Sequence, residues 1–203
     1  MSDQLNIYMV NTKYVRNLMN AEKRAYKDKR CNTILSNSPQ NNKEGRPYVG
    51  IIVIANNRKY CIPFCSSDEK TKYENMRENI TMRKIRDEKG KVIGILNINN
   101  MIPVRDEYLE VFDTAIHDGD TEKQIQYKKN CAAELKWCRD HQSEIERFAN
   151  NLHDIICSNE TFGKRAICPH YEALEKECDK AKPLPRRSVQ KQNKRNKRKA
   201  KQQ

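Results

Sequence analysis

The sequence predicts an α+β fold, with a mostly antiparallel sheet in the first half of the chain and helices in the second. Two observations favour this class. Short runs rich in β-branched and aromatic side chains, separated by turn residues, fill residues 5–104. From residue 121 onward, apolar residues instead recur at the spacing of a helix.

The clearest strand signal is a predicted hairpin. Residues 48–55 and 58–64 form its two arms, and Asn56-Asn57 between them suits a tight turn with positive φ. A rigid strand end is a common place to build a site. Serines after a strand are, however, more often turn formers than catalytic groups. This hairpin ends in three small polar residues, Cys65, Ser66 and Ser67.

Weaker patterns predict the other elements of the sheet. A helix is expected to start at Thr12, with Asn11 or Thr12 as its cap. Residues 91–98 are apolar on both faces, which indicates a central, well-covered strand. Strands are expected at residues 5–10, 81–86, 91–98 and 101–104, the last at an edge or a strand start because it contains Pro103.

Three helices are expected in the second half, over residues 121–139, 143–157 and 170–179. Ser143 and Glu146 match a capping box at the start of the second helix. A stripe of apolar residues predicts the core-facing sides of the first two helices: Leu135, Cys138, Ile145, Phe148, Leu152 and Ile155. In the third, Tyr171, Leu174 and Cys178 are expected to face inward.

The charge divides the chain into one domain, residues 1–182, and a basic tail, residues 183–203. The tail carries nine of the 40 Lys and Arg residues and no Asp or Glu. With almost nothing apolar to bury, it is expected to be disordered. It is either a solubilising extension or an arm that binds RNA phosphates through counterion release, with Arg186 and Arg187 among its contacts.

Several function classes are not expected from the sequence. No run approaches 18 apolar residues and no secretory signal is evident, so we expect a cytoplasmic protein without a membrane partner. No phosphate-binding glycine motif is present. The eight cysteines lack a short-spaced framework, which indicates reduced core thiols. Three Cys/His pairs fit no common zinc spacing, namely Cys138/His141, His153/Cys157 and Cys168/His170. We therefore expect no metal and no cofactor.

Several blocks, in this order, resemble the ToxN/AbiQ family of endoribonuclease toxins from type III toxin–antitoxin and phage-defence systems. Their order and spacing carry the resemblance, which covers roughly residues 5–180. The blocks are Thr12-Lys13-Tyr14, residues 46–51 (RPYVGI), residues 59–66 (KYCIPFCS), residues 94–98 (GILNI), residues 101–104 (MIPV), residues 124–127 (QIQY) and residues 135–139 (LKWCR).

The resemblance implies a strongly bent antiparallel sheet or partial β-barrel, like the Kid/MazF toxin core, with C-terminal helices. It also implies a metal-independent, sequence-preferring endoribonuclease that leaves a 2′,3′-cyclic phosphate and a 5′-hydroxyl. Its expected partners are cellular and phage RNA, and a repeated antitoxin RNA, folded as a pseudoknot, that the toxin processes. Toxin and antitoxin RNA would form a closed hetero-oligomer.

The resemblance also implies site residues. Ser66 matches the family's strand-end serine, Arg46 a basic position, and Tyr14 an aromatic hydroxyl. Cys65 stands where some relatives have threonine. Asp68 aligns with a family lysine, so Lys70 or Lys72 would replace that lysine, and a second family tyrosine has no counterpart before Arg46. Further candidate RNA contacts are Lys59, Ser67, Lys70 and Lys72.

Two alternatives remain open from the sequence. One is a non-catalytic RNA-binding module that uses the basic tail. The other is a MazF-like toxin with a protein antitoxin. Short tandem repeats in the upstream DNA would favour the type III toxin, and an upstream antitoxin reading frame would favour the MazF-like toxin.

Overall fold

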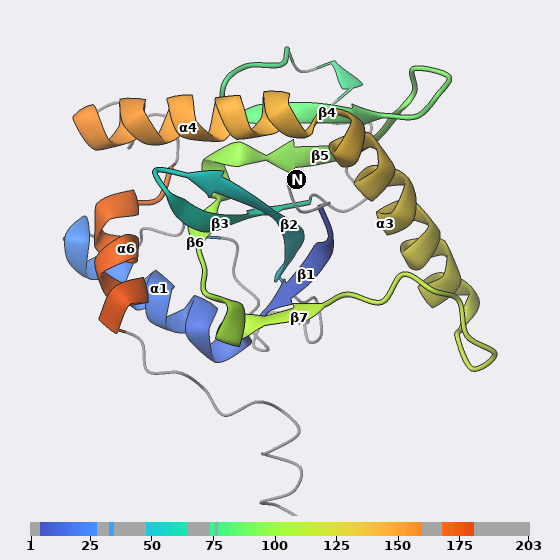
Figure 1. Ribbon diagram of the computed structural model, residues 1–203, viewed down its shortest axis with the longest axis horizontal. Helices are drawn as coiled ribbons and strands as arrows, with labels where there is room; N and C mark the ends of the chain where they lie inside the picture. Colours follow the sequence, from blue (N-terminus) through green and yellow to red (C-terminus); the bar gives the residue numbers. More distant parts are fainter. Residues whose placement is uncertain are drawn as a thin grey trace, which may run out of the picture.

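The computed structural model describes residues 5–27, 33–34, 48–64, 74–75, 77–159 and 168–180. These residues form two antiparallel sheets and four α-helices (Figure 1). The predicted α+β class is therefore confirmed. The described strands close no barrel, and the Kid/MazF-like bend of the sheet stays a prediction.

The larger sheet combines strands from both ends of the first 111 residues. Its strands are β1 (Ile7–Val10), β2 (Tyr48–Ala55), β3 (Arg58–Pro63), β6 (Ile102–Pro103) and β7 (Leu109–Val111). They lie in the order β6-β3-β2-β1-β7, and all neighbours are antiparallel. The proline-containing strand β6 is at an edge, as the sequence predicted.

The central hairpin of this sheet follows directly from its turn. Asn56 and Asn57 have φ values of 48° and 56°, and Ala55 pairs with Arg58. Two consecutive residues with positive φ match the twist of the flanking strands, and asparagine tolerates this conformation well. The predicted hairpin and its two-residue turn are confirmed.

A second, two-stranded sheet consists of β4 (Met82–Arg86) and β5 (Val92–Asn97). The predicted second hairpin is therefore confirmed, but the expectation of one sheet over residues 5–104 is wrong. The two sheets touch through one bridge, between Phe64 at the end of β3 and Leu96 of β5. The strand pattern gives each hairpin, but the expectation that residues 91–98 form a central strand is wrong: apart from this bridge, β5 pairs only with β4 among the described residues.

Helices cover both faces of the larger sheet (Figure 1). The helix α4 (Gln142–Ser158) packs on β2, and α3 (Glu122–Asp140) packs beside the second sheet. Two further helices lie side by side toward the other face, α1 (Thr12–Ala25) and α6 (Tyr171–Lys180). Two 3₁₀ turns flank β6, namely η3 (Ile98–Asn100) and η4 (Asp106–Tyr108).

The sheet therefore separates two layers of core. Strand β3 shows the division, because alternate side chains point to opposite faces. Tyr60 and Ile62 join the layer under α3 and α4. Cys61, between them, joins the layer under α1 and α6. Because both faces of this strand are buried, its sequence is apolar at consecutive positions instead of alternating.

The helix predictions need two corrections. The capping box is not at Ser143: α4 starts at Gln142 with His141 as N-cap, and the box lies at Thr121 and Gln124 of α3. A single residue joins α3 to α4, so Ser143 already lies inside the first helical turn.

The second correction concerns the stripe. Ile155 is 37% exposed, and Ile156 is buried instead. A helix with 3.6 residues per turn that buries Ile145 and Leu152 also buries the position four residues after Leu152. The inward orientation of Tyr171, Leu174 and Cys178 is confirmed.

The cysteines behave as core residues. All six described cysteines are free, and five of them are buried, with Cys157 half-buried. Cys31 and Cys65 lie outside the described residues. In the part of the chain that the structure describes, none of the helices has the length and apolar character to cross a membrane.

Candidate functional site

The strand that leads to the predicted site ends at the junction of the two sheets. β3 finishes at Pro63, and Phe64 then pairs with Leu96 of β5. The candidate residues that follow are outside the described part of the chain, as are Arg46 and the tail. These candidates are Arg46, Cys65, Ser66, Ser67, Lys70, Lys72, Arg186 and Arg187, and their roles stay predictions.

The far end of this segment is also attached to the second sheet. Lys84 of β4 donates from Nζ to the carbonyl oxygen of Glu74 at 2.8 Å, and from its backbone nitrogen to Glu78 Oε1 at 2.7 Å. Lys84 is only 7% exposed, so its ammonium group is held in place. The segment that contains Ser66 thus starts where the end of β3 meets β5, and it ends beside β4.

Tyr14 lies in the core between α1 and β6. The helix begins at its cap, Asn11, whose Oδ1 accepts the backbone N–H groups of Lys13 and Tyr14 at 3.0 and 3.1 Å. The Tyr14 hydroxyl donates to the carbonyl oxygen of Pro103 at 2.8 Å, and its ring stacks on Tyr108 with 4.2 Å between centroids. Burial raises the pKa of Tyr14 far above its ordinary value.

These contacts define what Tyr14 can do. A hydroxyl that is neutral, 1% exposed and bound to a backbone carbonyl is well placed to join α1 to β6. It is a poor proton donor, because its raised pKa opposes loss of the proton. The catalytic role of Tyr14 stays a prediction.

Lys59 is exposed on β3 and forms an ion pair. Its Nζ lies 2.7 and 2.9 Å from the two carboxylate oxygens of Asp106. Both side chains are exposed to solvent, and such pairs contribute at most about 1 kcal/mol to stability. A phosphate could therefore replace Asp106 at small cost. The predicted RNA contact of Lys59 stays a prediction.

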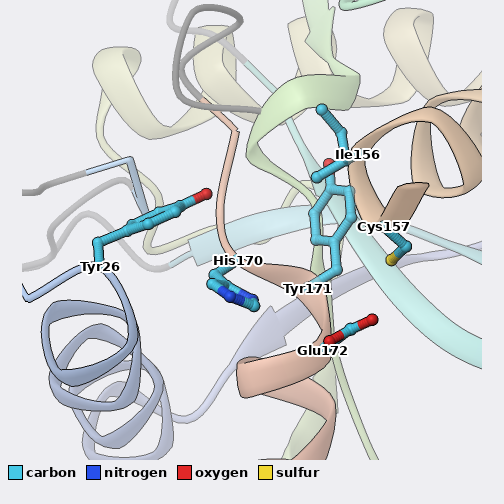
Figure 2. A pocket seen from close by; sticks show the side chains of 6 residues that line it. All are labelled: Tyr26, Ile156, Cys157, His170, Tyr171 and Glu172. Carbon is cyan, nitrogen blue, oxygen red and sulfur yellow. The ribbon is translucent and has the colours of Figure 1, made fainter. Parts of the chain in front are cut away.

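A cavity of about 150 Å³ lies between the end of α1, the end of α4 and the start of α6 (Figure 2). His170 lies between Tyr26 and Tyr171, and its ring centroid is 5.3 Å from that of Tyr26. The Tyr26 hydroxyl donates to the carbonyl oxygen of Cys168 at 2.9 Å. Cys157 and Glu172 also line this cavity.

Behind the cavity lies a buried polar network that the sequence analysis missed. Glu175 Oε1 accepts the Tyr60 hydroxyl at 2.7 Å and lies 3.0 Å from His153 Nε2. The His153 ring stacks on Tyr171. The available signal was a histidine within the buried stripe of α4. Its partner Glu175 is on another helix, so spacing alone could not reveal the pair.

The network contains a thiol, a histidine and a carboxylate, but it is not set up for nucleophilic chemistry. Cys157 Sγ is 3.6 Å from His153 Nε2. Burial raises the pKa of the Cys157 thiol to about 11, so the thiolate is scarce at neutral pH. Among the described residues, no three His, Cys, Asp or Glu side chains are grouped so as to hold a metal ion. The arrangement instead satisfies buried polar groups.

The fold is α+β, and strand β3 of the larger sheet ends against strand β5 of the second sheet. The family model described as "Toxin ToxN, type III toxin-antitoxin system" matches residues 6–179. Since this match spans most of the chain, the protein belongs to the ToxN toxin family of type III toxin–antitoxin systems. The resemblance found in the sequence is thereby confirmed.

Known relatives agree with this assignment. The Endoribonuclease ToxN of Bacillus thuringiensis subsp. kurstaki is 24% identical over 187 residues, which are 89% of this chain and 86% of the relative. A solved toxin, inhibited selectively by a non-coding RNA pseudoknot in a type III system, is 18% identical with a TM-score of 0.67. That match covers 88% of this chain and 98% of the solved one.

Another solved structure shares the fold. It is AbiQ, a lactococcal anti-phage endoribonuclease of a type III system, with a TM-score of 0.61 and 16% identity. The match covers 87% of this chain and 96% of AbiQ. At these identities the structural likeness establishes the shared fold.

Proposed function

We propose that this protein is an endoribonuclease toxin of a type III toxin–antitoxin system. The observation that carries the proposal is the family match over residues 6–179, together with a curated relative named as an endoribonuclease. The fold shared with two solved toxins of type III systems supports it. The protein would act on cellular and phage RNA in the cytoplasm.

The proposed reaction is a transesterification within the RNA. The 2′-hydroxyl attacks the adjacent phosphorus, the bond to the 5′-oxygen breaks, and the ends are a 2′,3′-cyclic phosphate and a 5′-hydroxyl. Because the RNA supplies its own nucleophile, the protein needs only to align the attack and to stabilise the charge that develops on the phosphate. The proposal therefore requires no metal and no cofactor.

The candidate residues have distinct parts in this proposal. Ser66 and Cys65 would hydrogen-bond the scissile phosphate, and Arg46 would bind it through its planar guanidinium. Lys70 or Lys72 would supply a second cation. Further RNA contacts would come from Lys59, Ser67, Arg186 and Arg187.

Tyr14 would serve as a positioning residue. Its hydroxyl donates to Pro103 and its pKa is raised by burial, so it is suited to holding α1 against β6 near the strand ends. A direct role in proton transfer would require this hydrogen bond to break first.

The proposed inhibitor is an RNA. The fold is shared with a toxin that a non-coding RNA pseudoknot inhibits, and with a protein of a bacterial antiviral system regulated by a processed non-coding RNA. By analogy, a repeated antitoxin RNA would be cut by this protein and would remain bound in a closed protein–RNA assembly.

The direct test is to incubate the purified protein with RNA in excess EDTA and to map the ends. Cleavage that persists and leaves cyclic phosphates supports the proposed reaction, whereas binding without cleavage supports an RNA-binding module.

A second experiment compares Ser66→Ala with the matched control Ser158→Ala. Ser158 is a suitable control because its hydroxyl donates to the carbonyl oxygen of Ile155 at the end of α4. We expect Ser66→Ala alone to abolish growth inhibition. Full toxicity of Ser66→Ala would refute the assigned site.

A further inference from the structure

A second, open hollow of about 540 Å³ lies between β4 and the corner where α3 passes into α4. In Figure 1 this is the region where the two long helices meet beside the second sheet. We call it the β4–α4 groove. The residues that define it here are Arg83, Arg86, Trp137, His141 and Phe148. None of them belongs to the candidate site described above.

An aromatic stack forms one wall of the β4–α4 groove. The rings of Trp137 and His141 are 4.0 Å apart between centroids and only 13° from parallel. His141 Nδ1 is 2.8 Å from the carbonyl oxygen of Trp137, a contact that fixes the ring in this orientation. Both side chains are half-buried. They therefore present a rigid planar surface to the groove.

Arginines from β4 form the opposite wall. The Arg83 guanidinium lies 3.2 Å from the ring centroid of Phe148, and its Nε is 3.7 Å from Glu144. Arg86 is exposed and donates from Nη1 to the carbonyl oxygen of Gly90 at 3.0 Å. Within the described parts of the chain, Arg86 forms no ion pair, so its charge is available to an anion.

The two carboxylates at this groove are engaged with the protein itself. Glu78 accepts the backbone nitrogen of Lys84, and Glu144 faces Arg83. An anion that enters beside Arg86 would thus meet a cation whose charge no described carboxylate neutralises. Planar aromatic surfaces next to available cations are the pattern by which proteins bind single-stranded nucleic acids.

The β4–α4 groove also lies where the segment with the predicted serine returns to the second sheet, since Glu74 and Glu78 both contact Lys84 of β4. We propose that this groove binds one unpaired RNA nucleotide, with the base stacked on the Trp137–His141 pair and the phosphate at Arg86. The inference rests on the proposed function, because it takes RNA as the ligand. Bases within a duplex are already stacked, so the groove would select single strands.

The chain offers a direct probe of this inference, because Trp137 is its single tryptophan. The full-length protein is titrated with a 2′-O-methyl RNA of about twelve nucleotides, a length near the footprint of single-strand-binding sites. The methyl group blocks the attacking hydroxyl, so the RNA binds without being cut. We expect saturable quenching of the tryptophan fluorescence by the single strand, and much weaker quenching by the same RNA in a duplex.

Two variants distinguish binding in the β4–α4 groove from the general attraction of a basic protein for RNA. Arg86→Gln should weaken single-strand binding about fivefold or more, in the range expected for one lost phosphate contact. Lys123→Gln removes the same charge from an exposed position on α3, about 20 Å along the helix from Trp137, and should change binding less than about twofold. His141→Ala should reduce the quenching by removing one ring of the stack. Thermal melting of each variant shows that the fold is intact.

The outcomes distinguish this inference from the proposed function. If unmodified RNA is cleaved but the 2′-O-methyl strand leaves the fluorescence unchanged, the inference is wrong and the function stands. Equal quenching by duplex and single strand, or equal effects of Arg86→Gln and Lys123→Gln, would also overturn it. If RNA quenches the fluorescence and is never cleaved, the nucleotide site stands and the proposed catalysis fails. If RNA is neither bound nor cleaved, both fail.

Discussion

Replacing Glu22 with glutamine should stabilise the protein at alkaline pH and leave it almost unchanged at acidic pH. Glu22 is on the inner face of α1 and is 1% exposed. Its Oε1 accepts the Thr33 hydroxyl, and no described residue hydrogen-bonds its Oε2. Burial is the main reason that the pKa of this carboxyl rises from 4.5 to about 7, and backbone N–H groups of Thr33 and Ile34 partly oppose the rise.

The size of the effect follows from the two pKa values. In the folded protein the carboxyl holds its proton up to about pH 7, and in the unfolded chain it releases the proton near pH 4.5. The folded state therefore loses stability relative to the unfolded chain as pH rises from 4.5 to 7. The difference of 7 minus 4.5, at 1.36 kcal/mol per unit, is about 3 kcal/mol. Glutamine is uncharged throughout, keeps an oxygen for Thr33, and avoids this loss.

The assay is urea unfolding of both proteins at about pH 5 and about pH 8.5, below and above the raised pKa. We expect the free energies of unfolding to agree within about 1 kcal/mol at the lower pH. At the higher pH, Glu22→Gln should be more stable by about 3 kcal/mol. Other titrating groups cancel in the difference between the two proteins. A variant that is less stable than the parent at the higher pH would refute the reasoning, because it would show that the charged carboxylate is favoured in the folded state.

Two further predictions concern the sheet and Tyr14. Gly50→Ala should lower the free energy of unfolding by more than about 3 kcal/mol, because the new Cβ would be 2.0 Å from the backbone oxygen of Ile62. Gly119→Ala, where a Cβ meets nothing within 4 Å, is the control and should be nearly neutral in the same melt. Tyr14→Phe should cost about 1–2 kcal/mol by removing the bond to Pro103, and should leave the pH–rate profile of RNA cleavage unchanged. Loss of one limb of that profile would instead show that Tyr14 transfers a proton.

The sequence predicted the fold well where local signals decide it. Asn56 and Asn57 fix the central hairpin through their own backbone preference, so no distant contact is needed to locate it. Strand β7 was missed for the opposite reason. It has three residues, and it is a strand because Val111 and its neighbours pair with β1, about 100 residues earlier in the chain. No pattern of three residues can carry that information.

The candidate sites, like the fold, could be predicted where local sequence decides them and not where distant contacts do. Family motifs pointed to Tyr14 and Ser66, but motifs do not report environment. The burial of Tyr14 could have been read from Leu18 and Ala21, which lie on the same face of α1. The Trp137–His141 stack was also visible as an i, i+4 pair. The arginines of the facing wall, Arg83 and Arg86, could not be placed beside it, because β4 and α3 come together only through the packing of the helices on the second sheet.

The strand order of the larger sheet also bears on how the protein folds while it is being made. β1 is an interior strand whose partners are β2 and β7, so the sheet cannot be completed before Val111 has been synthesised. The helix α1, which follows β1 directly, packs against α6, the last described helix. Arg139 also donates to the carbonyl oxygen of Leu5 at 2.8 Å. We therefore expect these long-range contacts to delay assembly until nearly the whole domain has left the ribosome. A nascent or truncated chain would thus lack the fold on which a toxin's activity depends.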